Sequence, residues 1–242
     1  MRSATNAVVL LLVCCTAAAQ SLNLDPGSTD NHPPTPVVWY QRVWPDARPQ
    51  NVSIVVDVTG QGLYSSSSRI TAAPTPARSF ANITQNDGGT EQEVKQEFTL
   101  SPENVKLVFA SAERLRYFDG DFAYKKKVAS TGAKTLTYAD ATRHFSTTYD
   151  ASMNRDVDAL THFFGGISST IEFGERLKLK YRHDKLGLNE ELTGMDDASR
   201  NGWLEEVQIV APLLKTLAND PSVLHMARLK AAQILARAGI KQ

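Results

Sequence analysis

The chain has 242 residues with 26 Lys and Arg against 26 Asp and Glu, so its formal net charge is zero. Hydrophobic residues make up 42% and charged residues 21%, values that argue against a wholly disordered chain. Because the charges balance, there is no electrostatic reason to expect a nucleic acid as partner.

The first 20 residues have the three parts of a secretory signal peptide. Arg2 supplies the positive start, residues 7–15 (AVVLLLVCC) form the apolar core, and residues 16–20 contain the small side chains of a cleavage region. The apolar run is far shorter than the roughly 20 residues that a membrane-spanning helix needs. We therefore predict an exported protein, secreted or periplasmic, with no transmembrane segment after the signal peptide is removed.

Both cysteines, Cys14 and Cys15, lie inside this segment, so the mature chain is expected to have no disulfide. An exported protein without disulfides depends on its core for stability, and about 220 residues are enough to build one. The absence of cysteine from the mature chain also excludes a cysteine nucleophile, a Cys-rich zinc site and an iron–sulfur cluster.

The next part of the chain, after a proline-rich extended lead-in at 21–36, indicates β-strands. Val52, Ile54, Val56 and Val58 recur with the period of two that a half-buried strand requires. Residues 37–44 are the expected partner of this strand.

Turns are predicted at three places in this strand-rich part. Glycines mark one at 60–62, and the serines at 65–68 favour a second. Residues 85–89 (QNDGG) are a hairpin-turn signal, and residues 92–100 are expected to form the strand that follows.

A helix is predicted to begin at Ser101-Pro102-Glu103, because serine caps, proline suits the first helical position and glutamate favours the positive end of the helix dipole. Residues 117–149 indicate strands again, with turns at Asp119-Gly120 and at 138–141. Lys125 to Lys127 are expected to lie on a strand and to protect an exposed sheet edge.

From about Asn154 the apolar residues recur at helical spacings of three and four. The first helix contains Gly165-Gly166, where a kink or break is expected. Further helices are predicted at 185–198, at 202–218 with a bend at Pro212, and at 222–238.

Residues 209–235 resemble a HEAT-type helix pair. The matching features are Pro-Leu-Leu at 212–214, Asp220-Pro221 between the helices, and Ala227, Ala231 and Leu235 on the second helix. A solenoid needs about three repeats. A single copy implies one packed helix hairpin.

Strands followed by helices favour an α+β fold. We predict an N-terminal antiparallel β-sheet with one intervening helix, followed by a C-terminal group of about four helices. The expected organisation is a signal peptide (1–20), an extended lead-in (21–36) and a single α+β domain (37–242), strand-rich over 37–150 and helix-rich over 151–240; two domains remain the alternative. The expected core consists of Val52, Ile54, Val56, Val105, Val108, Phe109, Leu160, Phe164, Ile167, Leu214, Ile234 and Leu235.

Metal-site patterns are weak in this sequence. The histidines (His32, His144, His162, His183 and His225) include no HExxH motif. His183-Asp184 is interpreted as a solvated helix end. Asp119-Gly120-Asp121 is interpreted as a turn, because the later oxygen ligands of a calcium loop are missing.

Motifs for hydrolysis and nucleotide binding are incomplete. Residues 166–170 lack the last glycine of GxSxG and lie in a predicted helix, and residues 60–62 lack the third glycine of a dinucleotide turn. Acidic residues occur in close pairs at Asp156/Asp158, Glu190/Glu191, Asp196/Asp197 and Glu205/Glu206. Adjacent helical residues do not face the same way, and acids near helix starts are explained by the helix dipole.

Two further patterns are interpreted conservatively. Trp39, Tyr40, Trp44 and Tyr64 could form an aromatic ligand surface, but such residues more often belong to the core or rim of a sheet. Asn51-Val52-Ser53 and Asn82-Ile83-Thr84 are glycosylation sequons, which matter only if the source modifies exported proteins.

The sequence therefore assigns no catalytic, cofactor-binding or metal residue and no cofactor. We expect a non-enzymatic exported protein that binds a protein partner or has a structural role; the alternative to a protein partner is a small apolar ligand. Two alternatives stay open. An unrecognised hydrolase would have a deep pocket in which titratable groups converge, and a carrier of an apolar ligand would have a large apolar pocket with few charges.

Overall fold

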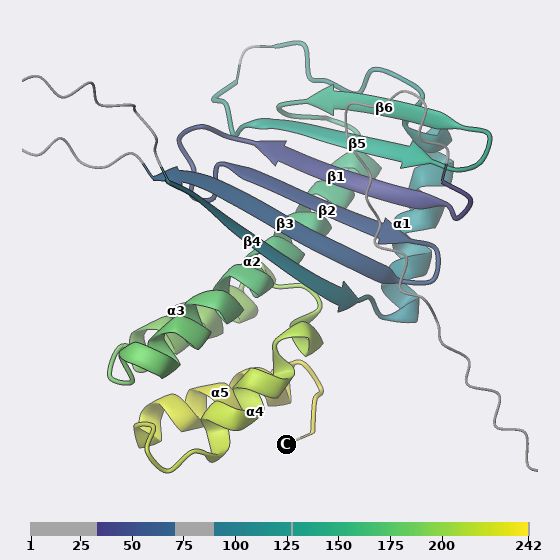
Figure 1. The fold of residues 1–242 in the computed structure, drawn as a ribbon. Helices are drawn as coiled ribbons and strands as arrows, with labels where there is room; N and C mark the ends of the chain where they lie inside the picture. The colour runs from purple at the N-terminus through teal and green to yellow at the C-terminus, as the bar shows by residue number, and fades with distance from the viewer. Residues whose placement is uncertain (1–32, 71–89, 127, 242) are drawn as a thin grey trace, which may run out of the picture. The chain divides into compact units, whose positions relative to one another are not determined.

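The computed structural model describes residues 33–70, 90–126 and 128–241, and in these ranges six strands form one antiparallel sheet in the order β4-β3-β2-β1-β5-β6 (Figure 1). The strands are β1 (Val37–Val43), β2 (Asn51–Asp57), β3 (Gln61–Ile70), β4 (Thr90–Thr99), β5 (Ala133–Ala139) and β6 (His144–Tyr149). The predicted signal peptide, the hairpin turn at 85–89, Asn82 and His32 lie outside the described residues.

The helices follow the expected order. Helix α1 (Pro102–Arg114) and the 3-10 turn η1 (Arg116–Phe118) connect β4 to β5. After β6 come α2 (Arg155–His183), α3 (Leu188–Arg200), η2 (Val207–Ile209), α4 (Ala211–Asn219) and α5 (His225–Arg237). The α+β prediction is confirmed: an antiparallel sheet with one intervening helix is followed by four helices.

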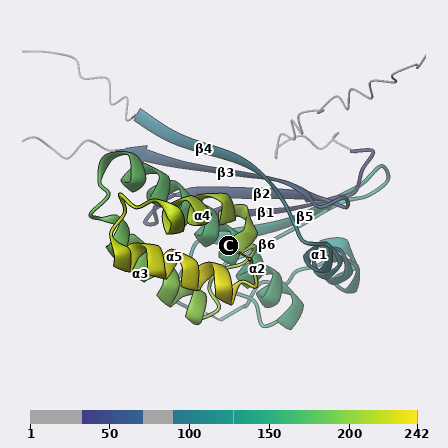
Figure 2. The same cartoon turned by 90° about the horizontal axis from the view of Figure 1, so that it is seen from below.

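The sheet is built around β1, which pairs with β2 on one side and with β5 on the other. Alternate residues of the central strands, such as Val38, Tyr40 and Ile54, are buried on the face that α1 and α2 cover. Figure 2 shows α3, α4 and α5 on the same side of the sheet as α2. The period of two therefore assigns one face of the sheet to the core.

Two hydrophobic clusters form the core, and α2 contributes to both. Its first half, from Val157 to Ile171, packs against the sheet and α1. Leu177, near its end, packs with α3, α4 and α5. Ten of the twelve expected core residues are buried, whereas Val105 and Phe109 on α1 are only partly buried.

Two strand predictions were wrong in detail. Ser65 to Ser68 form part of β3 and not a turn, because their backbone pairing with β4 continues without a break. Lys125 and Lys126 lie in an irregular segment and not on a strand, and Lys127 lies outside the described residues. Lys125 instead forms an ion pair with Asp121.

The helix prediction for 202–218 was also wrong at its start. Helix α4 begins at Ala211, and Pro212 lies in its first turn, where its missing N–H costs nothing. The expected bend at Pro212 therefore becomes a helix start. The α4–α5 pair forms the helix hairpin that the HEAT-like pattern implied.

Helix α2 continues through Gly165-Gly166, where a kink or break had been expected. Gly166 instead permits close packing: a Cβ there would lie 2.6 Å from Cγ of Glu205 and 3.1 Å from its backbone nitrogen. A Cβ at Gly165 would meet nothing within 4 Å. The two glycines therefore have different roles.

This difference predicts opposite effects for two matched substitutions. Gly165→Ala should stabilise the protein by about 0.5–1 kcal/mol, because alanine favours the helix. Gly166→Ala should destabilise it by about 1–3 kcal/mol, because overpacking outweighs the same helical gain. Urea unfolding of both variants measures the two effects. Equal stabilisation by both would contradict the close packing of α2 against Glu205.

Candidate functional site

A pocket of about 160 Å³ opens between β3, β4 and helix α2. Its lining combines hydroxyl, charged and apolar side chains from four segments. These residues are Arg48, Pro49, Tyr64, Ser66, Ser68, Val94, Ile171, Glu172, Glu175 and Arg176.

The local structure explains why these side chains meet. Tyr64, Ser66 and Ser68 occupy alternate positions of β3, so they share the face that α2 covers. The α2 residues of the pocket are Ile171, Glu172, Glu175 and Arg176. The last three follow Ile171 at spacings of one, four and five residues, so all four lie on two successive turns at one side of the helix. Arg48 and Pro49 come from the loop between β1 and β2.

Glu172 is the central carboxylate of the pocket. Its Oε1 accepts a hydrogen bond of 2.7 Å from the hydroxyl of Ser168 and a long one of 3.5 Å from the hydroxyl of Tyr64. It forms no ion pair with any described residue. Burial and the charge of Glu172 raise the pKa of Tyr64 to about 12, so the phenol stays protonated as a donor at neutral pH.

Two other charges of the pocket are already paired. Glu175 accepts a hydrogen bond of 2.6 Å from Lys178. Nε of Arg176 donates to Glu191 at 2.6 Å, and its guanidinium lies 4.4 Å from the ring centre of Phe173.

Arg48, the remaining charge, is exposed and donates to two backbone carbonyls, those of Ala47 at 2.9 Å and Pro45 at 3.4 Å. It makes no ion pair within the described ranges. Glu172 and Arg48 are therefore the two charged residues of the pocket that have no ionic partner there.

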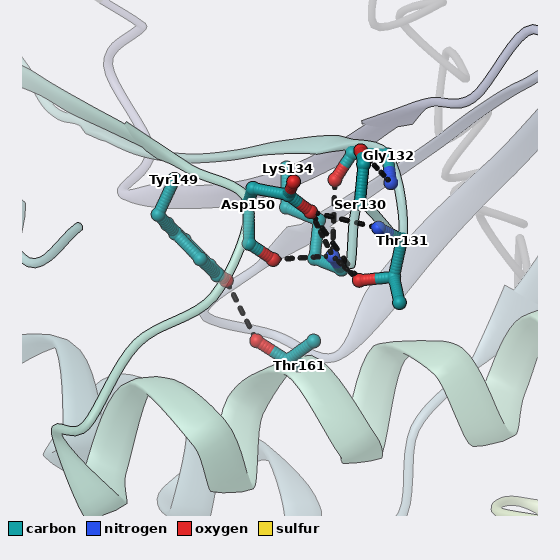
Figure 3. Close-up of polar contacts among 7 residues, drawn as sticks. All are labelled: Ser130, Thr131, Gly132, Lys134, Tyr149, Asp150 and Thr161. Carbon is teal, nitrogen blue, oxygen red and sulfur yellow. Dashed lines mark hydrogen bonds and ion pairs between the residues drawn. The ribbon is translucent and has the colours of Figure 1, made fainter. Parts of the chain in front are cut away.

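The buried Lys134 of β5 lies on the helix-covered face of the sheet, as the pocket does (Figure 3). Nζ of Lys134 donates to the hydroxyl of Thr131 at 2.8 Å, the carbonyl of Gly132 at 3.0 Å and the carbonyl of Asp150 at 2.7 Å. Burial lowers the pKa of Lys134; the carboxylate of Asp150 opposes this and the charge of Arg42 adds to it. All three ammonium protons have acceptors, so this lysine ties two loops together.

Arg42 connects this cluster to the pocket. It lies opposite Lys134 on one neighbouring strand and opposite Val52 on the other. Its Nη2 donates to the carbonyl of Pro49 at 3.5 Å, and Pro49 lines the pocket. Its Nε is buried without a hydrogen-bond partner. Two like charges opposite each other on adjacent strands are destabilising, so the acceptors around Lys134 offset this cost.

A second polar cluster surrounds Asp140 at the β5–β6 turn. The carboxylate accepts from the amides of Thr142 and Arg143, both at 2.8 Å, from Nε of Arg143 at 2.8 Å, and from the hydroxyl of Tyr138 at 3.0 Å. Burial alone would raise the pKa of Asp140, but these donors hold it well below its usual range. The guanidinium of Arg143 also lies 3.8 Å from the ring centre of Tyr117.

Each acidic pair has at least one member with a structural partner. Asp156 lies in the first turn of α2, as predicted, and forms an ion pair of 2.7 Å with Arg114. Oε1 of Glu206 reaches the start of α1, where it accepts from the amide of Ser101 at 3.0 Å and from Nδ2 of Asn104 at 2.8 Å. Burial and the charge of Glu206 raise the pKa of Glu205. Further ion pairs join Asp196 to Arg200 and Arg237, and Glu191 to Arg176.

The aromatic residues do not form one surface. Tyr40 and Tyr64 are buried on the helix-covered face. Trp39 belongs to the alternate positions of β1 and donates from Nε1 to Ser53 at 2.6 Å.

The described histidines and acidic residues do not gather into a metal site. His144, His162, His183 and His225 are all exposed. Across the described ranges, no three His, Asp or Glu side chains come close enough to hold a metal ion.

Sequence reasoning missed Glu172 and Arg48. Neither belongs to a motif, and more than 120 positions of the numbering separate them. Among the lining residues, Tyr64 had been named as part of the aromatic set, and Ser66 and Ser68 as part of a predicted turn. No local pattern could have joined these residues, because the pocket exists only once β3 and α2 pack together.

The comparisons with known proteins give no relative. No protein-family model matches the chain, and no curated protein is significantly similar to it. In the described part of the chain, no helix combines the length and the apolar character that crossing a membrane requires.

Proposed function

We propose that this chain is a non-enzymatic, exported binding protein that holds a small polar group of its partner in the pocket between β3 and α2. One observation carries the proposal: Glu172 and Arg48 line the same cavity, and neither has an ionic partner among the described residues. Charged groups in a partly enclosed site favour a ligand that supplies the missing partners.

The pocket offers weaker support to the hydrolase alternative. No histidine lines it. Ser168, which bonds to Glu172, is 2% exposed within α2 and does not line the cavity. An attacking serine must reach the substrate, so the Ser168–Glu172 pair is better explained as a structural hydrogen bond.

The pocket also differs from the one that an apolar carrier needs. It is smaller than the roughly 300 Å³ at which drug-sized ligand sites begin, and four of its ten lining residues are charged. The ligand is therefore expected to be small and polar, which replaces the apolar ligand anticipated from composition.

Native mass spectrometry of the mature protein, purified from the exported fraction of its own source, tests the proposal. We expect a discrete ligand or partner that the wild type retains and that the Glu172→Gln variant, produced in the same source, loses. Glu113→Gln is the matched control, since Glu113 is an exposed glutamate on α1 that does not line the pocket. A bare monomer, or an adduct that both variants retain, would contradict binding at this pocket.

A further inference from the structure

We infer that the ligand of this pocket is a small zwitterion, with an ammonium and a carboxylate on one compact skeleton, as in a free α-amino acid. The inference rests on the proposed function and specifies the class of ligand. It is carried by the opposite signs of Glu172 and Arg48 in a single cavity.

The charges exclude simpler ligands. A ligand with only a positive charge would pair with Glu172 but would face the guanidinium of Arg48. A ligand with only a negative charge would pair with Arg48 but would face the carboxylate of Glu172. Like charges that share one pocket repel, which disfavours both of these ligands. A zwitterion satisfies both groups, with the ammonium on the carboxylate and the carboxylate on the planar guanidinium.

The size and the remaining walls fit the same class. A cavity of about 150 Å³ holds benzene, so 160 Å³ suits a ligand of similar or slightly larger size. Ser66 and Ser68 offer hydroxyls that can donate or accept. Val94 and Ile171 offer apolar surface to an aliphatic side chain. The cavity is too small for a folded chain segment.

The other charges of the pocket are expected to contribute little. Glu175 and Arg176 already have partners, Lys178 and Glu191. A ligand that recruited either residue would first have to break an existing ion pair. Glu172 and Arg48 form hydrogen bonds only to neutral groups. Each can therefore bind a ligand without first breaking an ion pair.

Isothermal titration calorimetry of the mature protein with three probes that share one aliphatic skeleton tests the inference. Leucine carries both charges, 3-methylbutylamine is the same skeleton without the carboxylate, and 4-methylpentanoic acid is the same skeleton without the ammonium. We expect leucine to bind at least tenfold more tightly than either fragment. Glycine and phenylalanine, titrated in the same way, bracket the size that the cavity accepts.

Variants assign the two charges. Glu172→Gln should weaken leucine binding at least tenfold and abolish the preference for leucine over the acid. Arg48→Met should also weaken leucine binding at least tenfold, and it should abolish the preference for leucine over the amine. Because Arg48 is exposed, this variant should fold normally. Glu113→Gln, at an exposed position of α1 outside the pocket, should change leucine binding less than twofold.

The outcomes separate the two proposals. Binding of the amine or of the acid as tightly as leucine would overturn the zwitterion while leaving the pocket as a binding site. If none of the three amino acids binds at millimolar concentration, the inference is overturned, and the native mass spectrometry experiment decides independently whether the pocket binds another partner.

Discussion

Replacing Phe164 by alanine is expected to lower the free energy of unfolding by roughly 3–5 kcal/mol, the usual cost of removing a fully buried phenyl ring. Phe164 on α2 has no exposed surface. Its ring stacks on Tyr40 of β1 at 5.2 Å between ring centres and meets the edge of Phe163 at 5.5 Å. The substitution would leave a cavity where α2 contacts the middle strand of the sheet.

Urea unfolding followed by circular dichroism measures this effect. Leu179→Ala on the same helix is the control, because Leu179 is 61% exposed and its replacement should change stability by less than about 0.5 kcal/mol. A loss below 1 kcal/mol for Phe164→Ala would show that α2 does not pack on the sheet through this residue.

The second large effect is expected for Asp140→Asn, which should destabilise the protein by about 2–4 kcal/mol at pH 7. Hydrogen bonds to a charged group are worth about 1.5–3 kcal/mol. An asparagine amide can still accept from the backbone amides of Thr142 and Arg143. It cannot reproduce the charged contact with the Arg143 guanidinium, which lies 2.6 Å from Oδ2.

This effect should depend on pH with a defined sign. The pKa of Asp140 is lower in the folded protein than in the unfolded chain, where it is about 3.9. The stabilisation is therefore fully present above the unfolded pKa and is lost as the pH falls through the folded pKa. The stability difference between wild type and variant should narrow below about pH 4. Asp46→Asn, at an exposed loop position, is the control. A difference in stability between the wild type and Asp140→Asn that stays constant down to pH 2 would contradict the mechanism.

The same cluster holds an unusual piece of backbone. Arg116, Tyr117 and Phe118 have φ values of 52°, 60° and 69°, so three consecutive non-glycine residues are left-handed. This conformation costs about 1–2 kcal/mol per residue. The ring of Tyr117 contacts both the guanidinium of Arg143, at 3.8 Å, and the ring of Tyr138, at 4.7 Å between ring centres. Together with the burial of Phe118, these contacts offset the cost, so Asp140→Asn is also expected to loosen this turn.

Elements with a strong local signal were predictable from the sequence. The alternation at Val52, Ile54 and Val56 predicted β2, and Ser101-Pro102-Glu103 predicted the start of α1. The spacing of apolar residues from Val157 to Ile171 predicted α2 and its buried side. In each case the residues of one element are enough to determine whether that segment forms a strand or a helix.

The errors arose where distant segments decide the local structure. Ser65 to Ser68 have turn composition, but pairing with β4 along the whole run, and with β2 as far as Ser67, makes them a strand. Gly166 resembles a helix breaker, but the contact with Glu205, which is 39 positions away, explains it. Tertiary contacts override weak local preferences because their free energies are larger.

The class of fold, the order of its elements and the burial of ten of the twelve expected core residues follow from the sequence alone, because hydrophobic periodicity is a local property of the chain. Which polar residues share a pocket depends instead on how distant segments pack. Arg48, Tyr64 and Glu172 come from a loop, a strand and a helix, and their proximity results from α2 packing against the sheet. The pairing of the other pocket charges, which leaves Glu172 and Arg48 without an ionic partner in the described ranges, follows from the same packing and has no counterpart in any local pattern.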